Sequence, residues 1–500
     1  MSFARWHIDL LALVAGVIGP LAFAPFGWFW LAPLSIAALF FLLRFGSDRR
    51  AFFRAWLFGV GFFGLGVSWV AESFQYNHIA WPVAIGLTIA FVFFLSLFIA
   101  FAMWAARRLV DVRSTWALCT AVPALWIAAE WSRGEFLTGF TWLQLGYAQI
   151  DGPLAGFAPI VGSLGLSALV AVSAGLLVGL PGMGRRRWVG VVALVCIWAG
   201  GAGLRVVDWT EPAGDALSVA LVQGNVSQDQ KWRPENRIPT IRGYVQHTRA
   251  HWGADLVIWP ETAVPAFYRE AKGMLEKLGR EAAETNTELL VGLPVAGADG
   301  RPRNAMVHVG ADPQFYHKTH LVPFGEYLPL EALLRPLAKA VGIPVPAFTP
   351  GPMDQPLFVV NGVPAAMMIC YEVTFGDEVA AHLPAAQLLL NVSNDAWFGD
   401  SLAPHQHLQM ARMRALETGR FLARATNTGI TALINSRGRI TVRSKQFEQT
   451  VVTGSLTPMG GATPYVRVKD WPVLAMAALC ILGVWWRRRG LARNPSAPDR

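Results

Sequence analysis

Residues 364–372 read Pro364-Ala-Ala-Met-Met-Ile-Cys-Tyr-Glu372, an apolar run that ends in a cysteine, a tyrosine and a glutamate. A continuous apolar run of about four to eight residues is typical of a strand that is buried on both faces. In open α/β sheets, reactive side chains gather beyond the carboxyl ends of such strands. The stretch therefore predicts a buried strand with a candidate nucleophile, Cys370, at its end.

The other cysteines set Cys370 apart. Cys119, Cys196 and Cys480 lie inside long apolar runs, whereas Cys370 lies in the polar half of the chain. If that half is outside the cytoplasm, Cys370 is a lone thiol in an oxidising compartment, with no soluble partner for a disulfide. A free cysteine is commonly a small buried hydrophobic residue, so the neighbours of Cys370 must decide whether it is a nucleophile.

The composition is that of an integral membrane protein. Of the 500 residues, 54% are hydrophobic, 21 are Trp and only 15% are charged, which is too apolar for a soluble chain. Residues 1–207 are apolar runs separated by short basic loops, and residues 208–470 have the composition of a globular domain. A last apolar run, 471–486, precedes a basic tail, 487–500. We expect a multi-span α-helical membrane bundle of eight spans, with seven spans before the inserted domain and one after it.

Each predicted span approaches the ~20 residues that cross a ~30 Å hydrocarbon core. The predicted spans are Ile8–Phe26, Gly27–Phe45, Phe52–Ala71, Trp81–Ala105, Trp116–Trp131, Phe157–Leu180, Trp188–Val207 and Trp471–Trp486. The glycines of the third span predict close helix contacts; they are Gly59, Gly61, Gly64 and Gly66.

Basic residues alternate between the loops. They gather near Arg5, in 44–54, in 107–113, in 185–187 and in 487–489, whereas intervening short loops carry little positive charge. By the positive-inside rule, both termini are cytoplasmic and the 208–470 domain lies outside. The net charge of +9 then reflects topology. We expect no nucleic-acid partner, because the chain has no basic–aromatic platform or zinc-knuckle spacing.

Short aliphatic runs alternate with amphipathic stretches in residues 208–470, which indicates an α/β domain. The predicted strands are Leu217–Gln223, Asp255–Trp259, Glu288–Leu293, Ala305–Val309, Pro364–Ile369 and Ala386–Val392. The predicted helices include Asn236–Trp252, Ala271–Thr285 and His405–Thr418. Three polar clusters follow strands: Trp259-Pro-Glu-Thr262, Tyr316-His-Lys-Thr319 and Cys370-Tyr-Glu372.

Each cluster alone has an ordinary explanation, since Glu261 can be a solvated loop carboxylate and Lys318 an exposed loop lysine. Together, Glu261, Lys318 and Cys370 form a complete set for acyl transfer. The carboxylate can take the thiol proton. The ammonium can lower the thiol pKa and stabilise a tetrahedral oxyanion, helped by the backbone N–H after the cysteine.

The domain resembles the carbon–nitrogen hydrolase (nitrilase) superfamily, whose Glu–Lys–Cys triad would fall on Glu261, Lys318 and Cys370. The whole chain is similar to the bacterial apolipoprotein N-acyltransferase family. The matching blocks are Phe23-Ala-Pro-Phe-Gly27, Gly139-Phe-Thr-Trp-Leu-Gln-Leu-Gly-Tyr147, Gln223-Gly-Asn225, Trp259-Pro-Glu261, His317-Lys318, Leu321-Val-Pro-Phe-Gly-Glu-Tyr327, Cys370-Tyr-Glu372 and Ser393-Asn-Asp-Ala-Trp-Phe-Gly399.

This resemblance implies further roles and a fold. The implied fold of the inserted domain is an α-β-β-α sandwich. Glu326 matches a second essential glutamate that positions the lysine or the intermediate, and Tyr371 and Glu372 match residues beside the nucleophile. Trp232 and Asn304 match further important positions. Two alternatives stay open: Trp232 as a loop aromatic that covers core, and Glu372 as a structural carboxylate bonded to nearby backbone.

The resemblance also implies the reaction. The thiolate of Cys370 would attack the sn-1 ester of a phospholipid, and the resulting thioester would pass its acyl group to the α-amine of a diacylglyceryl-modified apolipoprotein. This ping-pong acyl transfer would end lipoprotein maturation in the bacterial inner membrane, with the catalytic domain on the periplasmic side. We expect no metal and no organic cofactor, because the thioester keeps the energy of the ester.

Other functions remain to be weighed. A membrane-tethered amidase or nitrilase would pass the acyl group to water, and a non-enzymatic scaffold would have no use for the triad. His405-Gln-His407 and His317-x-x-His320 have metal-like spacing, but neither has a persuasive third ligand. The two histidines at 405 and 407 fit the cap region of a helix better. A papain-like Cys–His pair is the sharper rival, although no papain signature surrounds any histidine.

Overall fold

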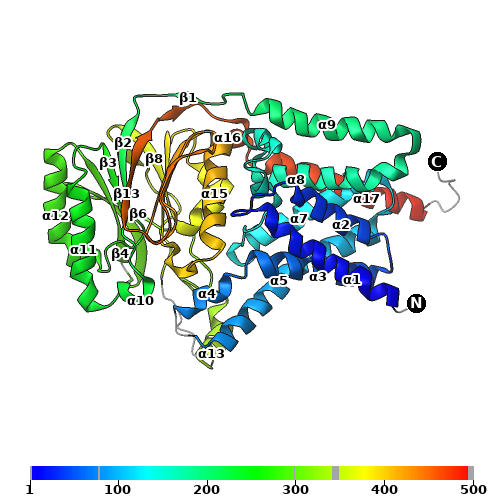
Figure 1. Ribbon diagram of the computed structural model, residues 1–500, viewed down its shortest axis with the longest axis horizontal. Coiled ribbons are helices and arrows are strands. Elements are labelled where there is room, and N and C mark those ends of the chain that lie inside the picture. Colours follow the sequence, from blue (N-terminus) through cyan, green and yellow to red (C-terminus); the bar gives the residue numbers. More distant parts are fainter. Residues whose placement is uncertain (1–2, 77–78, 298, 341–347, 494–500) are drawn as a thin grey trace. The chain divides into compact units, whose positions relative to one another are not determined.

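The computed structural model describes residues 3–76, 79–297, 299–340 and 348–493. The chain forms two compact units, drawn in Figure 1. A helical unit comprises Met1–Ser68, Ile85–Val207 and Val468–Arg500, and a catalytic unit comprises Trp69–Ala84 and Asp208–Arg467. Each unit is described below by itself.

The helical unit has a helix near each predicted span. Its α-helices are α1 (Phe3–Ile18), α2 (Leu31–Leu42), α3 (Asp48–Gly66), α5 (Trp81–Leu109), α6 (Thr115–Cys119), α7 (Ala121–Glu135), α8 (Ala158–Gly179), α9 (Arg187–Leu204) and α17 (Trp471–Arg493). By length and composition, two helical stretches of the described residues can cross a membrane: Trp81–Leu109 and Pro153–Leu204, which contains both α8 and α9. Shorter apolar helices cover Trp6–Ala22, Leu31–Leu42 and Trp471–Trp486.

Two predicted spans differ in detail. The fifth is interrupted at Thr120, between α6 and α7, where Pro123 occupies the first turn of α7; proline has no N–H to donate and fits a first turn. The predicted basic tail from 487 continues α17 as far as Arg493, and residues 494–500 lie outside the described residues.

Glycines bring the helices of this unit together as predicted for part of the third span. A Cβ on Gly61 would lie 2.3 Å from the carbonyl oxygen of Leu13 in α1, and a Cβ on Gly59 would lie 2.7 Å from the Cβ of Ser96 in α5. Gly64 faces open space. The helix backbones therefore approach more closely than a larger residue would allow.

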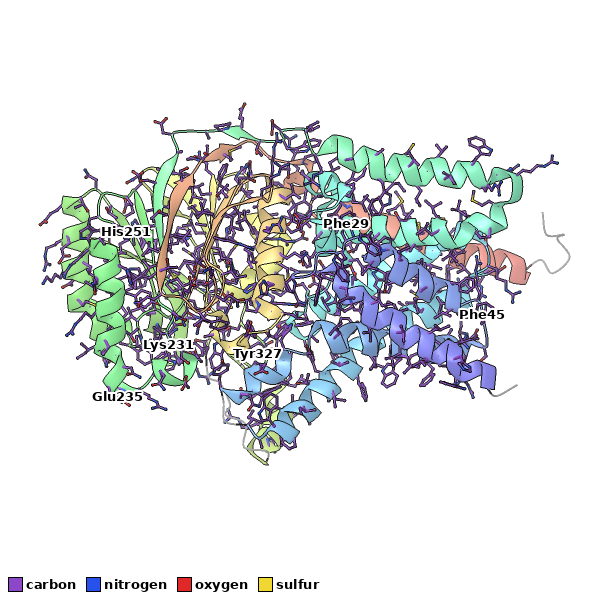
Figure 2. The ribbon with its side chains drawn as sticks, viewed as in Figure 1. Phe29, Phe45, Lys231, Glu235, His251 and Tyr327 are labelled. Atoms are coloured by element: carbon purple, nitrogen blue, oxygen red, sulfur yellow. The ribbon has the colours of Figure 1, made fainter. Side chains whose placement is uncertain are left out.

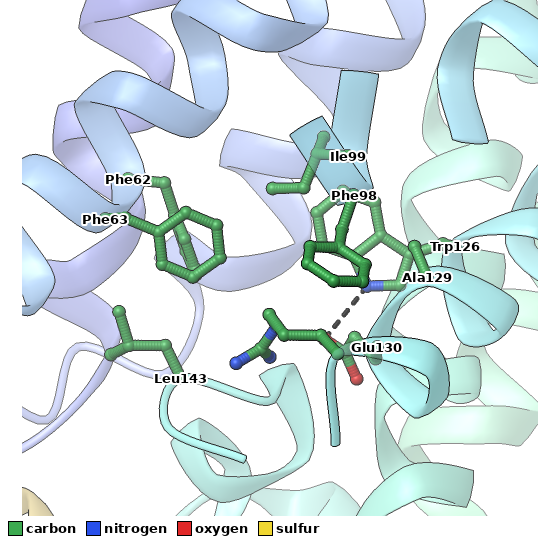
Figure 3. A pocket seen from close by; sticks show the side chains of 9 residues that line it. Phe62, Phe63, Phe98, Ile99, Trp126, Ala129, Glu130 and Leu143 are labelled. Carbon is green, nitrogen blue, oxygen red and sulfur yellow. Dashed lines mark hydrogen bonds between the residues drawn. The ribbon is translucent and has the colours of Figure 1, made fainter. Parts of the chain in front are cut away.

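A buried carboxylate lies inside the helical unit. Glu130 in α7 accepts hydrogen bonds from Trp126 Nε1 and from the backbone N–H of Leu145, both at 3.0 Å. Figure 3 shows Glu130 in a pocket lined by aromatic side chains, among them Phe62 and Phe98. Both donors bind Oε1 and lower the cost of burying this polar group.

The catalytic unit contains two six-stranded sheets, ordered β13-β2-β3-β4-β5-β6 and β12-β11-β10-β9-β8-β7. The strands of the first sheet are β2 (Leu217–Gln223), β3 (Leu256–Ile258), β4 (Glu288–Ala296), β5 (Pro302–Val309), β6 (Gln314–His317) and β13 (Thr450–Leu456). The strands of the second are β7 (Phe358–Val360), β8 (Val363–Ile369), β9 (Leu388–Ser393), β10 (Phe421–Thr426), β11 (Ala432–Ile434) and β12 (Ile440–Arg443). A short pair, β1 (Glu211–Pro212) and β14 (Met459–Gly460), joins the ends of the unit.

Helices cover the outer face of each sheet, as Figure 1 shows for α11, α12 and α15. The helices of this unit are α4 (Val70–Gln75), α10 (Gln228–Lys231), α11 (Pro234–Arg249), α12 (Tyr268–Glu284), α13 (Glu331–Ala340), α14 (Gly376–Ala381), α15 (Ala403–Thr418) and α16 (Pro464–Val468). Strand β8 illustrates the layers: Met367 and Ile369 pack in the core between the sheets, and Ala366 and Met368 pack in the core beneath α15. The predicted α-β-β-α sandwich is confirmed.

The six predicted strands are present, with boundaries shifted by a few residues. The sequence prediction missed β6, β7 and β10 to β13. Several of these have polar or exposed residues, such as β12 with its mostly exposed face, so that period-two apolar patterning is weak there. Helices α11, α12 and α15 begin two or three residues before their predicted starts.

The segment Trp69–Ala84 belongs to the catalytic unit, although it lies between two predicted spans. The indole N–H of Trp69 donates to Gln406 Oε1 at 3.1 Å, and its ring packs edge-on against Phe398. The ring of Tyr76 packs against Trp397. The third predicted span, drawn to Ala71, therefore ends too late, since α3 stops at Gly66 and the chain then packs on the catalytic unit.

Candidate active site

Cys370 lies on a sharp turn at the carboxyl end of β8. Its φ of 56° is in the left-handed region that non-glycine residues rarely adopt. Residues Cys370–Thr374 form a short 3-10 helix. Ser393, at the end of the neighbouring strand β9, hydrogen-bonds the thiol. The strand end therefore presents the sulfur at the edge of the sheet, as predicted.

Glu261 is held from two directions. It follows β3 and is 6% exposed. Its Oε1 accepts from Asn304 Nδ2 at 2.6 Å, and its Oε2 accepts from the backbone N–H of Asn394 at 2.7 Å. Because β3 belongs to one sheet and Asn394 follows β9 in the other, the carboxylate bridges the two layers of the sandwich.

Lys318 follows β6 and is 1% exposed. Its Nζ lies 2.8 Å from Glu326 Oε2 and 3.5 Å from Glu261 Oε1. Burial alone would lower the pKa of Lys318, but the charges of Glu326 and Glu261 outweigh it and raise the pKa above its ordinary value. The side chain is therefore a permanently charged ammonium beside the cysteine.

Asn304 and Glu326 complete this group, which we call the catalytic cluster (Glu261, Asn304, Lys318 and Glu326). Asn304 Nδ2 also lies 3.3 Å from Glu326 Oε1. The backbone carbonyl of Asn304 accepts the backbone N–H of Lys318 at 2.8 Å. Glu326 Oε2 accepts from the N–H of Val322. Residues distant in sequence thus converge at one end of the sandwich.

Three main effects set the pKa of Cys370. Burial raises the pKa of the thiol, the carboxylate of Glu261 raises it further, and Lys318 lowers it. Lys318 thus lowers the pKa of Cys370 as expected, although the net direction of the shift is upward. Desolvation of a thiolate exceeds the effect of one nearby cation, and Cys370 rests as a neutral thiol.

Glu372 makes a different set of contacts. It accepts from the backbone N–H groups of Thr319 and Ile369, each at 2.6 Å, and of His320 at 3.2 Å. It also accepts from the hydroxyls of Tyr316 at 3.0 Å and Thr319 at 2.8 Å. These five donors fit the alternative of a structural carboxylate bonded to nearby backbone.

Tyr371 and Trp232 are the other two residues that the sequence predicts for this site. Tyr371 is buried, and its ring packs edge-on against His320 and Phe375. Trp232 follows α10 and is 51% exposed. Half of the surface of Trp232 is covered and half faces solvent, so the alternative of an aromatic that covers core stays open beside the functional role.

The sequence prediction gave no role to several residues around this site. Lys231, labelled in Figure 2, is buried, and its Nζ lies 3.4 Å from the carbonyl oxygen of Glu261. Burial lowers the pKa of Lys231 to about 8, and Glu261 opposes the shift. Asn394 Nδ2 donates to Gln228 at 2.8 Å and Asn394 Oδ1 accepts from Asn427 at 3.0 Å. Asn394 lies in the family-matching block 393–399, which was the sequence feature that could have identified it.

His407 and His320, one from each histidine pair, contact protein groups through their rings. His407 lies in the first turns of α15, which begins at Ala403, and is buried, so the prediction of a cap region is wrong for it. Its Nε2 contacts the carbonyl oxygen of Cys370, and its Nδ1 contacts Asp395 and Arg424. With both ring nitrogens engaged, His407 has no nitrogen for the thiol. His320 Nδ1 lies 2.8 Å from Glu378. Among the described residues, no group of three or more His, Cys, Asp or Glu is arranged to hold a metal ion.

Two family models match the chain. The model described as the apolipoprotein N-acyltransferase N-terminal domain matches residues 15–176, and the carbon-nitrogen hydrolase model matches residues 218–465. The chain is 46% identical over 492 residues to an apolipoprotein N-acyltransferase of Methylococcus capsulatus, with 98% of this chain and 97% of the relative covered. It is 45% identical over 500 residues to one of Azotobacter vinelandii, with the same coverage. An amidase of the nitrilase superfamily from Nesterenkonia matches 52% of this chain and 97% of its own, at 19% identity and a TM-score of 0.36.

Proposed function

The chain belongs to the apolipoprotein N-acyltransferase family, and from that premise we propose that Cys370, Glu261 and Lys318 transfer a fatty acyl group from a phospholipid to a lipoprotein. The observation that carries the proposal is the convergence of Glu261 and Lys318, from separate strand ends, on the nucleophile turn. No metal or organic cofactor enters the reaction.

In the first half-reaction the sulfur of Cys370 attacks the carbonyl carbon of the sn-1 ester. Because burial keeps the thiol protonated, its proton must leave as the C–S bond forms, and Glu261 is the base that takes it. The C–O bond breaks, and the proton on Glu261 passes to the lysophospholipid oxygen. Lys318 and the backbone N–H of Tyr371 stabilise the tetrahedral oxyanion.

In the second half-reaction the α-amine of the diacylglyceryl-cysteine of an apolipoprotein attacks the thioester. Glu261 takes the amine proton, a C–N bond forms, the C–S bond breaks, and the proton returns to the sulfur of Cys370. Glu326 supports both steps, because its ion pair of 2.8 Å with Lys318 fixes the ammonium in place. The alternative of hydrolysis differs only in that water replaces the amine.

Intact mass spectrometry of the full chain in detergent tests this proposal. Incubation with phosphatidylethanolamine alone should add one acyl group to the wild-type chain and none to Cys370→Ala. A chain with Cys119, Cys196 and Cys480 replaced together is the matched control and should be acylated normally. Adding a diacylglyceryl lipopeptide should discharge the adduct, whereas rapid discharge in water alone would favour a hydrolase. Acylation of Cys370→Ala would overturn the nucleophile.

The topology is part of the proposal. We propose eight spans, both termini in the cytoplasm and the catalytic unit on the periplasmic side of the inner membrane, since the basic loops fall on one side in that arrangement. Reporter fusions at Gly184 and Gly214 should give a cytoplasmic and a periplasmic signal, respectively. The reverse pattern would contradict this orientation.

A further inference from the structure

A side chain from another element holds the carbonyl oxygen of the nucleophile. Nε2 of His407, from α15, lies 3.1 Å from the carbonyl oxygen of Cys370. His407 is 1% exposed, so water does not compete for this bond. A carbonyl oxygen can only accept. The contact therefore requires a proton on Nε2.

Two charged residues keep that proton on Nε2. Nδ1 of His407 lies 3.0 Å from Arg424 Nη2 and 3.0 Å from Asp395 Oδ1, and the same Nη2 lies 2.8 Å from Asp395 Oδ2. If the ring is neutral, Nδ1 accepts from Arg424; if it is charged, Nδ1 donates to Asp395. Nε2 carries a proton in both states. Burial and Arg424 lower the pKa of His407 while Asp395 raises it, and the net downward direction favours the neutral ring.

The carbonyl of Cys370 and the N–H of Tyr371 belong to one trans peptide group, so they point in opposite directions within one plane. A bond to the carbonyl therefore fixes where the N–H points. We propose that His407 is a positioning residue that aims the Tyr371 N–H at the oxyanion of the reacting ester. This inference rests on the proposed function, in which that N–H is an oxyanion donor.

The turn at Cys370 has a strained backbone that hydrogen bonds must stabilise. The left-handed φ of 56° at Cys370 costs energy for a residue with a side chain. On the near side of the turn, Glu372 Oε2 accepts the N–H of Ile369 at 2.6 Å. On the far side, His407 binds the carbonyl of Cys370 itself. The two bonds act on the peptide groups before Ile369 and after Cys370, with one peptide group between them, and so define the path of the turn through the nucleophile.

The bond also acts on the electrons of the peptide group. A hydrogen bond to a carbonyl polarises the amide and strengthens the N–H as a donor, as in any chain of hydrogen bonds. The buried Asp395–Arg424 pair supports His407 at its Nδ1. His407 is thus expected to affect steps that form an oxyanion and to leave the nucleophilicity of the sulfur unchanged.

Two reagents separate these effects. p-Nitrophenyl butyrate acylates a thiol through a tetrahedral oxyanion: the C–S bond forms, the C–O bond breaks and nitrophenolate leaves. Iodoacetamide alkylates the same sulfur by displacing iodide, and no oxyanion forms. In the full chain in detergent, His407→Phe should slow the nitrophenolate burst by about 10- to 100-fold, while the alkylation rate of Cys370 changes less than about threefold.

Matched variants complete the test. His407→Gln places an amide donor near the position of Nε2 and should restore most of the burst rate. His405→Phe, two residues away on the same helix, should leave both rates unchanged. Rate constants are taken from the folded fraction, and His407→Leu replaces His407→Phe if the larger ring does not fit. Equal loss of both rates, an unchanged burst, or failure of His407→Gln to improve on His407→Phe would each overturn the inference.

The ester probe keeps this inference apart from the proposed function. If the wild-type chain gives a burst with the nitrophenyl ester but no adduct with phospholipid, the lipid donor is wrong and the role of His407 stands or falls on its own rates. If the wild-type chain gives no burst, the role of His407 is overturned together with the nucleophile.

Discussion

Two groups of charged side chains lie near Cys370, and the two groups use their hydrogen bonds differently. In the catalytic cluster, Lys318, Glu261 and Glu326 bond mainly to one another and to Asn304. In the second group, Glu372 and His407 bond to backbone groups of the nucleophile turn and its neighbours. We call this second group the backbone-holding cluster (Glu372, His407, Asp395 and Arg424).

This difference in bonding partners indicates different roles for the two clusters. A charged group that bonds to other side chains can exchange a proton or move towards a charge that develops during the reaction. A carboxylate that accepts three backbone N–H groups is held in place by them. Changes in the catalytic cluster should therefore reduce rate more than stability. Changes in the backbone-holding cluster should reduce stability, and should affect rate only through the geometry of the turn.

Lys318→Arg gives the largest expected effect and tests the catalytic cluster. A planar guanidinium cannot replace a compact ammonium that lies 2.8 Å from Glu326 and 3.5 Å from Glu261. Thioester formation, followed by intact mass after mixing with phospholipid, should slow by ~10²-fold or more. Glu261→Gln is the companion variant and should be similarly slow, because it removes the base.

Both variants should insert and fold. Near-normal thioester formation by Lys318→Arg would mean that positive charge alone matters, and that Lys318 is not an oxyanion partner. That outcome would leave the family assignment intact.

The catalytic cluster was largely predictable and the backbone-holding cluster was not. Glu261 and Cys370 each follow an apolar run, so strand patterning places both at strand ends, although in different sheets. Lys318 follows β6, a strand that the sequence prediction missed. The function of Glu372 was left open, because a glutamate beside a cysteine has the same sequence pattern in either role. Only its contacts with Ile369 and Thr319 distinguish the two.

Two features had no usable sequence signal. Arg424 is completely buried within β10, and a buried arginine breaks the apolar alternation on which strand prediction relies. The segment Trp69–Ala84 reads as a loop between spans, and its packing on the catalytic unit depends on contacts hundreds of residues away, such as Trp69 with Gln406. Local patterning cannot report such partners.

Glu372→Gln should show the opposite balance from Lys318→Arg. An amide NH₂ would face N–H and O–H donors that now meet a carboxylate, so at least one buried donor would lose its partner. We expect a loss of about 4 kcal/mol in the free energy of unfolding, measured as a lower unfolding temperature in detergent. Loss of acyl transfer with unchanged stability would contradict the backbone-holding role and favour direct catalysis by Glu372.

Lys231→Met tests whether the region around Glu261 carries a cost in stability. The pKa of Lys231 in the folded chain, about 8, lies below the ordinary lysine value of 10.5, so the folded chain binds its proton more weakly than the unfolded chain. The penalty is fully present below pH 8 and disappears as the pH rises from about 8 towards 10.5, where the unfolded chain binds more protons.

At pH 7, Lys231→Met should therefore raise the free energy of unfolding by about 3 kcal/mol. The gain over the wild-type chain should shrink when unfolding temperatures are compared at pH 9.5. A gain that does not depend on pH would point to packing as its source. A loss of stability would mean that the ammonium is paired more favourably than its 3.4 Å contact with the Glu261 carbonyl suggests.

Tyr316→Phe should give the smallest effect, because it removes one donor from Glu372 and leaves the others in place. The hydroxyl of Tyr316 lies 3.0 Å from Glu372 Oε2, which also accepts the N–H of Ile369 at 2.6 Å. With that backbone bond kept, the carboxylate is still satisfied, and the unfolding free energy should fall by only about 1 kcal/mol. The rate of thioester formation should stay within about twofold of wild type, because Glu372 keeps its hold on the turn. A rate loss comparable to that of Lys318→Arg would mean that Tyr316 takes part in the reaction. The division between the catalytic cluster and the backbone-holding cluster would then be wrong.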